Sequence, residues 1–140
     1  MKKKAIVSVI SRQISEDEKD IEVVTPGEFY KKDDSYYVVY KETEISGMEG
    51  TTTTLKINPD SFTLIRMGTT TTKMEFEENN EKLVLYNTPY GVMELKITTK
   101  DLKVNVNDQG GDVLINYNMT IGGQKPQHTE LKVNIKTQYN

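Results

Sequence analysis

The chain has 140 residues, of which 35% are hydrophobic and 28% charged, and its formal net charge is −3. This length and composition are typical of one globular domain, so we expect a single domain over residues 1–140. The weak net charge and the presence of only two arginines, Arg12 and Arg66, argue against nucleic-acid binding, and the lack of cysteine excludes disulfides, thiolate metal sites and a cysteine nucleophile.

The amino terminus begins with Met1 and three lysines, like the basic head of a signal peptide. The apolar run that follows, Ala5 to Ile10, is shorter than the roughly 7 to 15 residues of a signal core. No other window approaches a membrane-spanning segment. We therefore expect a cytoplasmic protein that does not enter a membrane.

The composition favours β-strands. Valine, isoleucine and threonine together supply 40 residues, whereas alanine, the best helix former, occurs once. Turn-forming residues divide the chain into β-rich runs and predict roughly ten strands joined by short loops. The expected breaks lie at Glu16 to Asp20, Pro26-Gly27, Asp33-Asp34, Gly47 to Gly50, Asn58 to Asp60, Gly68, Glu78 to Asn80, Pro89 to Gly91, Asp108 to Gly111 and Gly122 to Pro126.

Most of these runs alternate between apolar and polar side chains. The predicted apolar faces are Thr53, Leu55 and Ile57; Met74 and Phe76; Met93, Leu95 and Ile97; Leu102, Val104 and Val106; and Leu131, Val133 and Ile135. A period of two with one polar face is typical of an antiparallel sheet with one buried side. Because an open sheet would expose long edges, we predict an all-β, up-and-down barrel.

Several segments resemble the YwiB-like family of small bacterial proteins of unknown function. The segments are Tyr36 to Glu42, Gly50 to Ile57, Ile65 to Gly68, Met74 to Phe76, Tyr86 to Gly91 and Ile115 to Tyr117. The most specific is Tyr-Asn-Thr-Pro-Tyr-Gly at Tyr86 to Gly91. The resemblance implies a calycin, or lipocalin-like, antiparallel barrel of about ten strands in the cytosol. It implies no known activity and no catalytic residues.

Two charged residues share the parity of apolar strand faces. Arg66 alternates with Leu64 and Phe62, and Glu42 alternates with Tyr40. If these faces point inward, the two charges enter the barrel and can form a neutralised structural pair, the commoner use of buried charges. The alternative is that Arg66 binds a carboxylate or phosphate of a ligand through its planar guanidinium. Ile65 and Met67, on the other face of the same run, are also apolar. The alternative that Arg66 points outward therefore remains.

Tyrosine accounts for eight of the eleven aromatic residues. Four of them, Tyr40, Tyr86, Tyr90 and Tyr117, could line a wet cavity or lie at the barrel rim, because a buried tyrosine usually needs a partner for its hydroxyl. Thr88 to Gly91 contains a proline and a glycine, which favours a tight turn over an aromatic lid.

His128 is the only histidine, and the nearest carboxylate in sequence is Glu130. This pair does not make a metal site, so we expect a surface histidine without a catalytic role, no metal and no cofactor. An enzyme is the least favoured class, because no catalytic constellation is visible. We expect binding of a small amphipathic or anionic ligand in the barrel. The alternative is an interaction module, as a monomer or homodimer, that uses an outer sheet face or rim loop.

Overall fold

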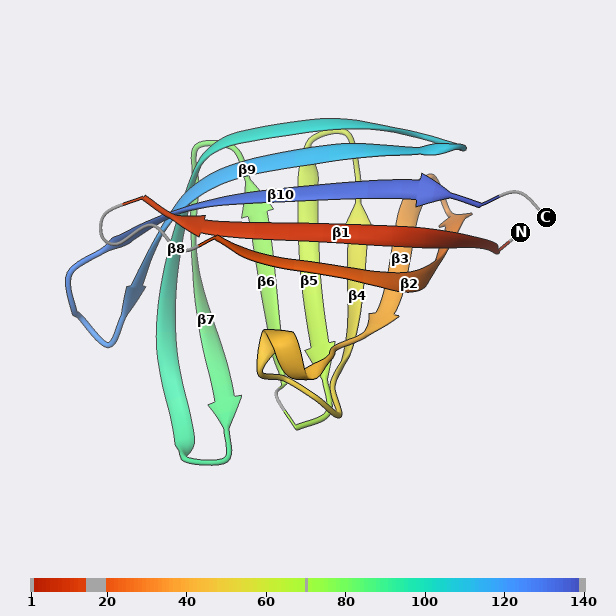
Figure 1. The fold of residues 1–140 in the computed structure, drawn as a ribbon. Helices are drawn as coiled ribbons and strands as arrows, with labels where there is room; N and C mark the ends of the chain where they lie inside the picture. Colours follow the sequence, from red (N-terminus) through yellow and green to blue (C-terminus); the bar gives the residue numbers. More distant parts are fainter. Residues whose placement is uncertain (1, 15–19, 70, 139–140) are drawn as a thin grey trace.

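The computed structural model describes residues 2–14, 20–69 and 71–138. Within these ranges the chain forms ten β-strands and one short 3-10 helix (Figure 1). No helix in the described ranges is long and apolar enough to cross a membrane. The elements are β1 (Lys3–Gln13), β2 (Ile21–Lys32), β3 (Ser35–Lys41), η1 (Glu44–Ser46), β4 (Thr52–Ile57), β5 (Ser61–Met67), β6 (Thr72–Glu77), β7 (Asn80–Thr88), β8 (Gly91–Asn107), β9 (Gly110–Ile121) and β10 (Gln127–Thr137).

The strands form one antiparallel sheet that curls into a barrel (Figure 1). Its order is β6-β5-β4-β3-β2-β1-β10-β9-β8-β7, so strands that are consecutive in sequence pair with each other, except β6 and β7, and β1 pairs with β10. The β1–β10 ladder pairs Ala5 with Thr137 and Gln13 with Thr129. The predicted all-β, up-and-down architecture is confirmed.

The barrel is nearly closed. Strands β6 and β7 stand at the two ends of the sheet order, although only a two-residue turn separates them. Side chains bridge this seam: the Lys82 Nζ lies 3.8 Å from Glu77 Oε1 and 3.9 Å from Glu75 Oε2. The backbone N–H of Leu102 also donates to Glu78 Oε2 at 3.3 Å. Figure 1 shows β6 and β7 diverging from their shared turn.

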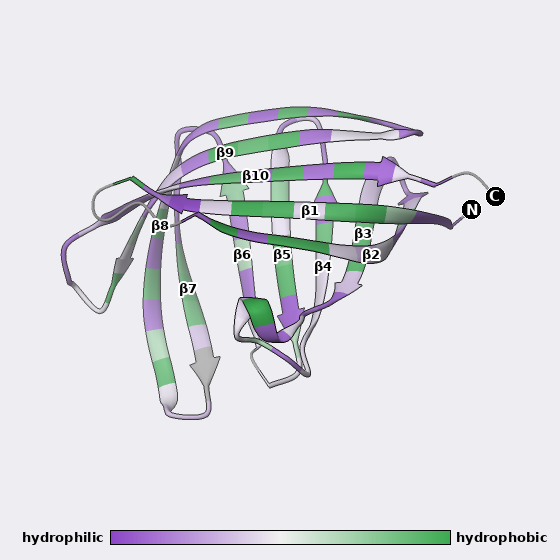
Figure 2. Ribbon diagram, viewed as in Figure 1, coloured by the Kyte–Doolittle hydropathy of each residue, from purple (hydrophilic) through white to green (hydrophobic). Residues whose placement is uncertain are grey.

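The predicted alternation places the core inside the barrel. Hydrophobic and hydrophilic bands alternate along β9 and β10 (Figure 2), and Leu131, Val133 and Ile135 are buried. On β4, Leu55 and Ile57 are each 1% exposed. Three aromatic rings anchor the centre, with Phe76 tilted against both Phe62 and Tyr117.

A β-bulge in β8 allows odd-numbered residues to face the core in the first half of the strand and even-numbered residues in the second half. The odd-numbered Leu95 and Ile97 are buried in the first half of the strand. The even-numbered Leu102 and Val104 pack against the core in the second half. The register against β9 shifts between Thr99 and Asp101, so one extra residue turns the second run inward.

The predicted break at Pro26-Gly27 is wrong, because both residues lie inside β2. Strand β2 pairs with β1 on both sides of this point, but with β3 only from Glu28 onward. Proline lacks the N–H that a second ladder would need. A Cβ at Gly27 would lie 2.8 Å from the carbonyl oxygen of Val39, so glycine permits the close crossing of β2 and β3. From Gly27 back to the start of β2, the two strands are no longer paired.

Candidate functional site

A pocket of about 190 Å³ lies inside the barrel at the end where β2 and β3 separate. Strands from both sides of the barrel line it, together with Ser46 of η1 and Met48 of the following loop. Its apolar lining consists of Val9, Ile21, Val23, Leu64, Met74, Phe76 and Leu131. The polar lining is Ser11, Tyr40, Glu42, Ser46, Arg66 and Tyr117.

A polar row crosses the inner face of four adjacent strands. Tyr40 of β3 pairs with Thr53 of β4, Thr53 pairs with Arg66 of β5, and Arg66 pairs with Thr72 of β6. Paired residues of an antiparallel ladder share a face, so all four side chains point the same way. Tyr40 and Thr72 are each 4% exposed and Thr53 is fully buried. Antiparallel register alone therefore gathers this polar layer.

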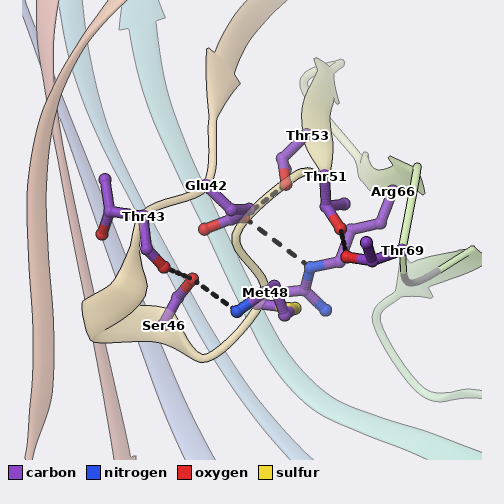
Figure 3. A network of polar contacts seen from close by, with 8 residues as sticks. All are labelled: Glu42, Thr43, Ser46, Met48, Thr51, Thr53, Arg66 and Thr69. Atoms are coloured by element: carbon purple, nitrogen blue, oxygen red, sulfur yellow. Dashed lines mark hydrogen bonds and ion pairs between the residues drawn. The ribbon is translucent and has the colours of Figure 1, made fainter.

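Glu42 and Arg66 form an ion pair at the pocket (Figure 3). The Arg66 Nε lies 3.8 Å from Glu42 Oε2, and the side chains are 21% and 3% exposed. This separation is too long for a hydrogen bond. The hydroxyl of Thr53 donates a hydrogen bond to the same Glu42 oxygen. The positive charge of Arg66 therefore balances the negative charge of Glu42, although the Arg66 Nε does not hydrogen-bond to the carboxylate.

The Arg66 Nε is buried and has no hydrogen-bond partner among the described residues. The hydroxyl of Thr72, its neighbour in the β5–β6 ladder, also lacks a partner in the described part of the chain. Buried polar groups are almost always hydrogen-bonded, and leaving one unpaired costs roughly 1–3 kcal/mol. Two such atoms in adjacent inward-facing residues mark a place where additional partners would be favourable.

The loop between β3 and β4 is held by its own hydrogen bonds (Figure 3). The Ser46 hydroxyl donates to the Thr43 carbonyl oxygen at 2.9 Å and accepts from the Met48 N–H at 3.3 Å. At its base, the Glu42 N–H donates to the Thr51 carbonyl oxygen at 2.8 Å. These contacts hold Ser46 and Met48 against the pocket.

The two pocket tyrosines are held in the neutral form. Burial raises the pKa of Tyr40 well above its usual value of 10.0, and the negative charge of Glu42 raises it further. Burial also raises the pKa of Tyr117. Both phenols therefore remain protonated, and their hydroxyls can donate hydrogen bonds.

We expect the free energy of unfolding to fall as the pH rises above about 10. The unfolded phenol of Tyr40 ionises there, whereas the folded one resists, so ionisation stabilises the unfolded state. Urea unfolding of Tyr40→Phe should show a shallower decline with pH than the parent protein. Equal declines in the two proteins would contradict the burial of a neutral Tyr40.

The structure brings together four of the six predicted site residues: Tyr40, Glu42, Arg66 and Tyr117. Arg66 and Glu42 both point inward, so the alternative of an outward Arg66 is excluded. Tyr86 lies half-buried on β7, and Tyr90 is fully exposed in the turn between β7 and β8; neither lines the pocket.

Sequence reasoning missed Thr53, Thr72, Ser46 and Met48 as parts of this site. The first two could have been found, because Thr53 shares the inward parity of Leu55 and Thr72 that of Met74. Ser46 and Met48 belong to an irregular loop that has no periodicity. Their position depends on the loop's tertiary hydrogen bonds.

His128 lies near the start of β10, and its Nδ1 is 3.1 Å from Asn118 Oδ1. It does not line the pocket. Among the described residues, no group of three or more histidine, aspartate or glutamate side chains is arranged to hold a metal ion.

The opposite end of the barrel carries a second hollow of about 370 Å³, lined in part by Phe29, Lys31 and Tyr36. Three of its polar residues, Lys3, Tyr36 and Asp108, contact one another. The Tyr36 hydroxyl donates to Asp108 Oδ1 at 2.6 Å, and this hydrogen bond lowers the pKa of the Asp108 carboxyl. Lys3 Nζ donates to the Asp108 carbonyl oxygen at 2.7 Å. These contacts bridge β1, β3 and the β8–β9 turn, a structural role.

Comparison with known proteins agrees with this architecture. A family model described as "Domain of unknown function (DUF1934)" matches residues 6–133. The chain is 24% identical over 128 residues to the "Uncharacterized beta-barrel protein YwiB" of Bacillus subtilis (strain 168), covering 89% of each protein. It superimposes on the crystal structure of the ywiB protein from Bacillus subtilis with a TM-score of 0.87 at 20% identity, covering 99% of this chain and 94% of the other. The protein therefore belongs to the DUF1934 family of YwiB-like β-barrels.

Proposed function

We propose that the protein binds one small amphipathic molecule in the 190 Å³ pocket, with the polar head of the ligand at Arg66. The observation that carries this proposal is the buried Arg66 Nε, which has no hydrogen-bond acceptor among the described residues. A ligand oxygen would supply that acceptor. The proposed role is binding and not catalysis.

The shape and chemistry of the pocket support this assignment. Ligand sites are usually concave, mostly apolar and equipped with a few convergent polar groups. Here Leu64, Met74 and Phe76 offer an apolar wall beside the polar groups of Tyr40 and Arg66. The volume is below the roughly 300–1,000 Å³ of sites for drug-sized molecules, so the ligand is small.

Native mass spectrometry of protein purified gently from its own host tests the proposal. We expect a reproducible additional mass that disappears on denaturation. Arg66→Met should lose it, and the double variant Glu42→Gln/Arg66→Met should also lose it while removing both buried charges. Arg12→Met is the matched control, because Arg12 pairs with Asp20 on the surface. Bare parent protein, or retention of the mass by both Arg66 variants, would contradict the proposal.

A homodimer through the β7–β8 hairpin is the second candidate. Leu83, Leu85 and Val92 are 67%, 65% and 62% exposed there. The register pairs Leu83 with Lys96 and Leu85 with Glu94, so aliphatic and charged side chains share this outer face. Strand β7 ends the sheet, and such an edge offers unpaired backbone groups to another strand. The same native spectra would show a ligand-free dimer if this candidate is correct.

A further inference from the structure

The charges of the pocket already balance. Among the described residues that line it, only Glu42 and Arg66 carry a formal charge at neutral pH. Each would be costly to bury alone, and together they are neutral. A ligand that carried a single negative charge would place a second anion beside Glu42. The net charge of the site therefore disfavours a simple anion.

Each of the two charges nevertheless retains unused bonding capacity. The Arg66 Nε donates to no described residue. Glu42 accepts from Thr53 and interacts with the Tyr40 hydroxyl, and a carboxylate offers about four lone-pair sites, so acceptor capacity remains. The two groups stand 3.8 Å apart without a hydrogen bond between them. A head group with one negative and one positive end would pair with both and keep the pocket neutral.

The size and lining of the pocket define the rest of the ligand. A volume of 190 Å³ is below the roughly 300–1,000 Å³ of sites for drug-sized molecules, which favours a small ligand over a long acyl chain. Leu64, Met74 and Phe76 present an apolar surface beside the charged pair. This surface suits one short aliphatic or thioether side chain.

We infer that the ligand is a small zwitterion of the α-amino-acid class with an apolar side chain. Its carboxylate pairs with Arg66, its ammonium pairs with Glu42, and its side chain packs toward Leu64 and Phe76. This inference rests on the proposed function and names the ligand class of the same site.

Calorimetric titration with three matched probes tests the inference. The probes are L-leucine, 4-methylpentanoate, which lacks the ammonium, and 3-methylbutylamine, which lacks the carboxylate. Parent protein should bind L-leucine at least about tenfold more tightly than either half-ligand, because each lost charge pair is expected to cost about tenfold. This comparison needs no variant, so it holds even if substitutions at the site impair folding.

Substitution of Glu42 should change the preference in a defined direction. Glu42→Gln keeps the shape and an acceptor for Thr53 but leaves Arg66 as the only charge, so 4-methylpentanoate should bind at least as tightly as L-leucine. Glu44→Gln, an exposed residue of η1, is the control and should preserve the parent preference.

The possible failures are distinguishable. Tighter binding of 4-methylpentanoate or 3-methylbutylamine than of L-leucine by the parent protein would overturn the zwitterion inference and retain the binding function. An unchanged preference in Glu42→Gln would also overturn it. No binding of any probe, together with bare protein in native spectra, would overturn both the inference and the proposed function.

Discussion

Phe62→Ala is expected to lower the free energy of unfolding by about 4 kcal/mol. The Phe62 side chain is fully buried on β5, and its ring lies 6.1 Å from that of Phe76, centroid to centroid. Alanine would remove the apolar contacts and leave a cavity, because strands fixed in a barrel relax only partly around a missing ring.

Urea denaturation followed by circular dichroism measures this loss. Phe62→Leu is the matched control and should cost about 1 kcal/mol, since it keeps most of the apolar volume. Phe62 does not line the pocket, so its loss tests the core alone. A loss below about 1 kcal/mol for Phe62→Ala would contradict the packed interior.

Arg66→Met is expected to lower the free energy of unfolding by about 2 kcal/mol. Methionine would fill part of the space of the arginine stem but would leave the Glu42 carboxylate buried without a cation. Glu42 would retain the hydrogen bond from Thr53, which moderates the loss. The partial exposure of Arg66, at 21% of its side chain, moderates it further.

A double-mutant cycle isolates the pair. Glu42→Gln/Arg66→Met should be more stable than Arg66→Met, because no buried charge remains. Arg12→Met should cost less than about 1 kcal/mol, because the Arg12–Asp20 pair is exposed to solvent. If Arg66→Met and Arg12→Met were equally stable, the ion pair inside the barrel would contribute no more to stability than the exposed Arg12–Asp20 pair.

Much of the fold was predictable from side-chain alternation. On β4 and β10, residues of one parity are apolar and those of the other are polar, and the barrel buries the predicted faces. The same parity put Arg66 on the face of Leu64 but left its direction open, and both residues line the pocket. Burial of one sheet face requires this pattern, so the pattern identifies the face.

The tyrosines show where this reasoning stops. Tyr40 and Tyr117 belong to central strands and line the pocket, whereas Tyr86 and Tyr90 belong to the β7–β8 hairpin and do not. The four residues look alike in sequence. Tyr86 pairs with Met93 in the part of the hairpin that lies beyond the first β8–β9 pair, Leu95 with Ile121, and Tyr90 lies in its turn. Local periodicity does not show where one strand extends past its neighbour.

Strand β2 shows the same limit. Pro26 and Gly27 are turn-forming residues, yet they lie within the strand, where Gly27 lets Val39 approach closely. Local propensity favoured a turn there, and pairing with β1 overrode it. The separation of β2 from β3 at this point makes the pocket possible.

The sequence by itself determined the strand-rich composition and the buried faces, because burial of one sheet face imposes a period of two. The inward direction of Arg66 needed the tertiary structure, since Ile65 and Met67 make the opposite face of β5 apolar too, and Glu42 lies after the end of β3. Only the tertiary structure decided that the seam between β6 and β7 is bridged by side chains and that Glu42 stands 3.8 Å from Arg66. It also decided that a pocket remains beside them. These features depend on how strands distant in sequence pack around a shared interior, and no local pattern encodes that packing.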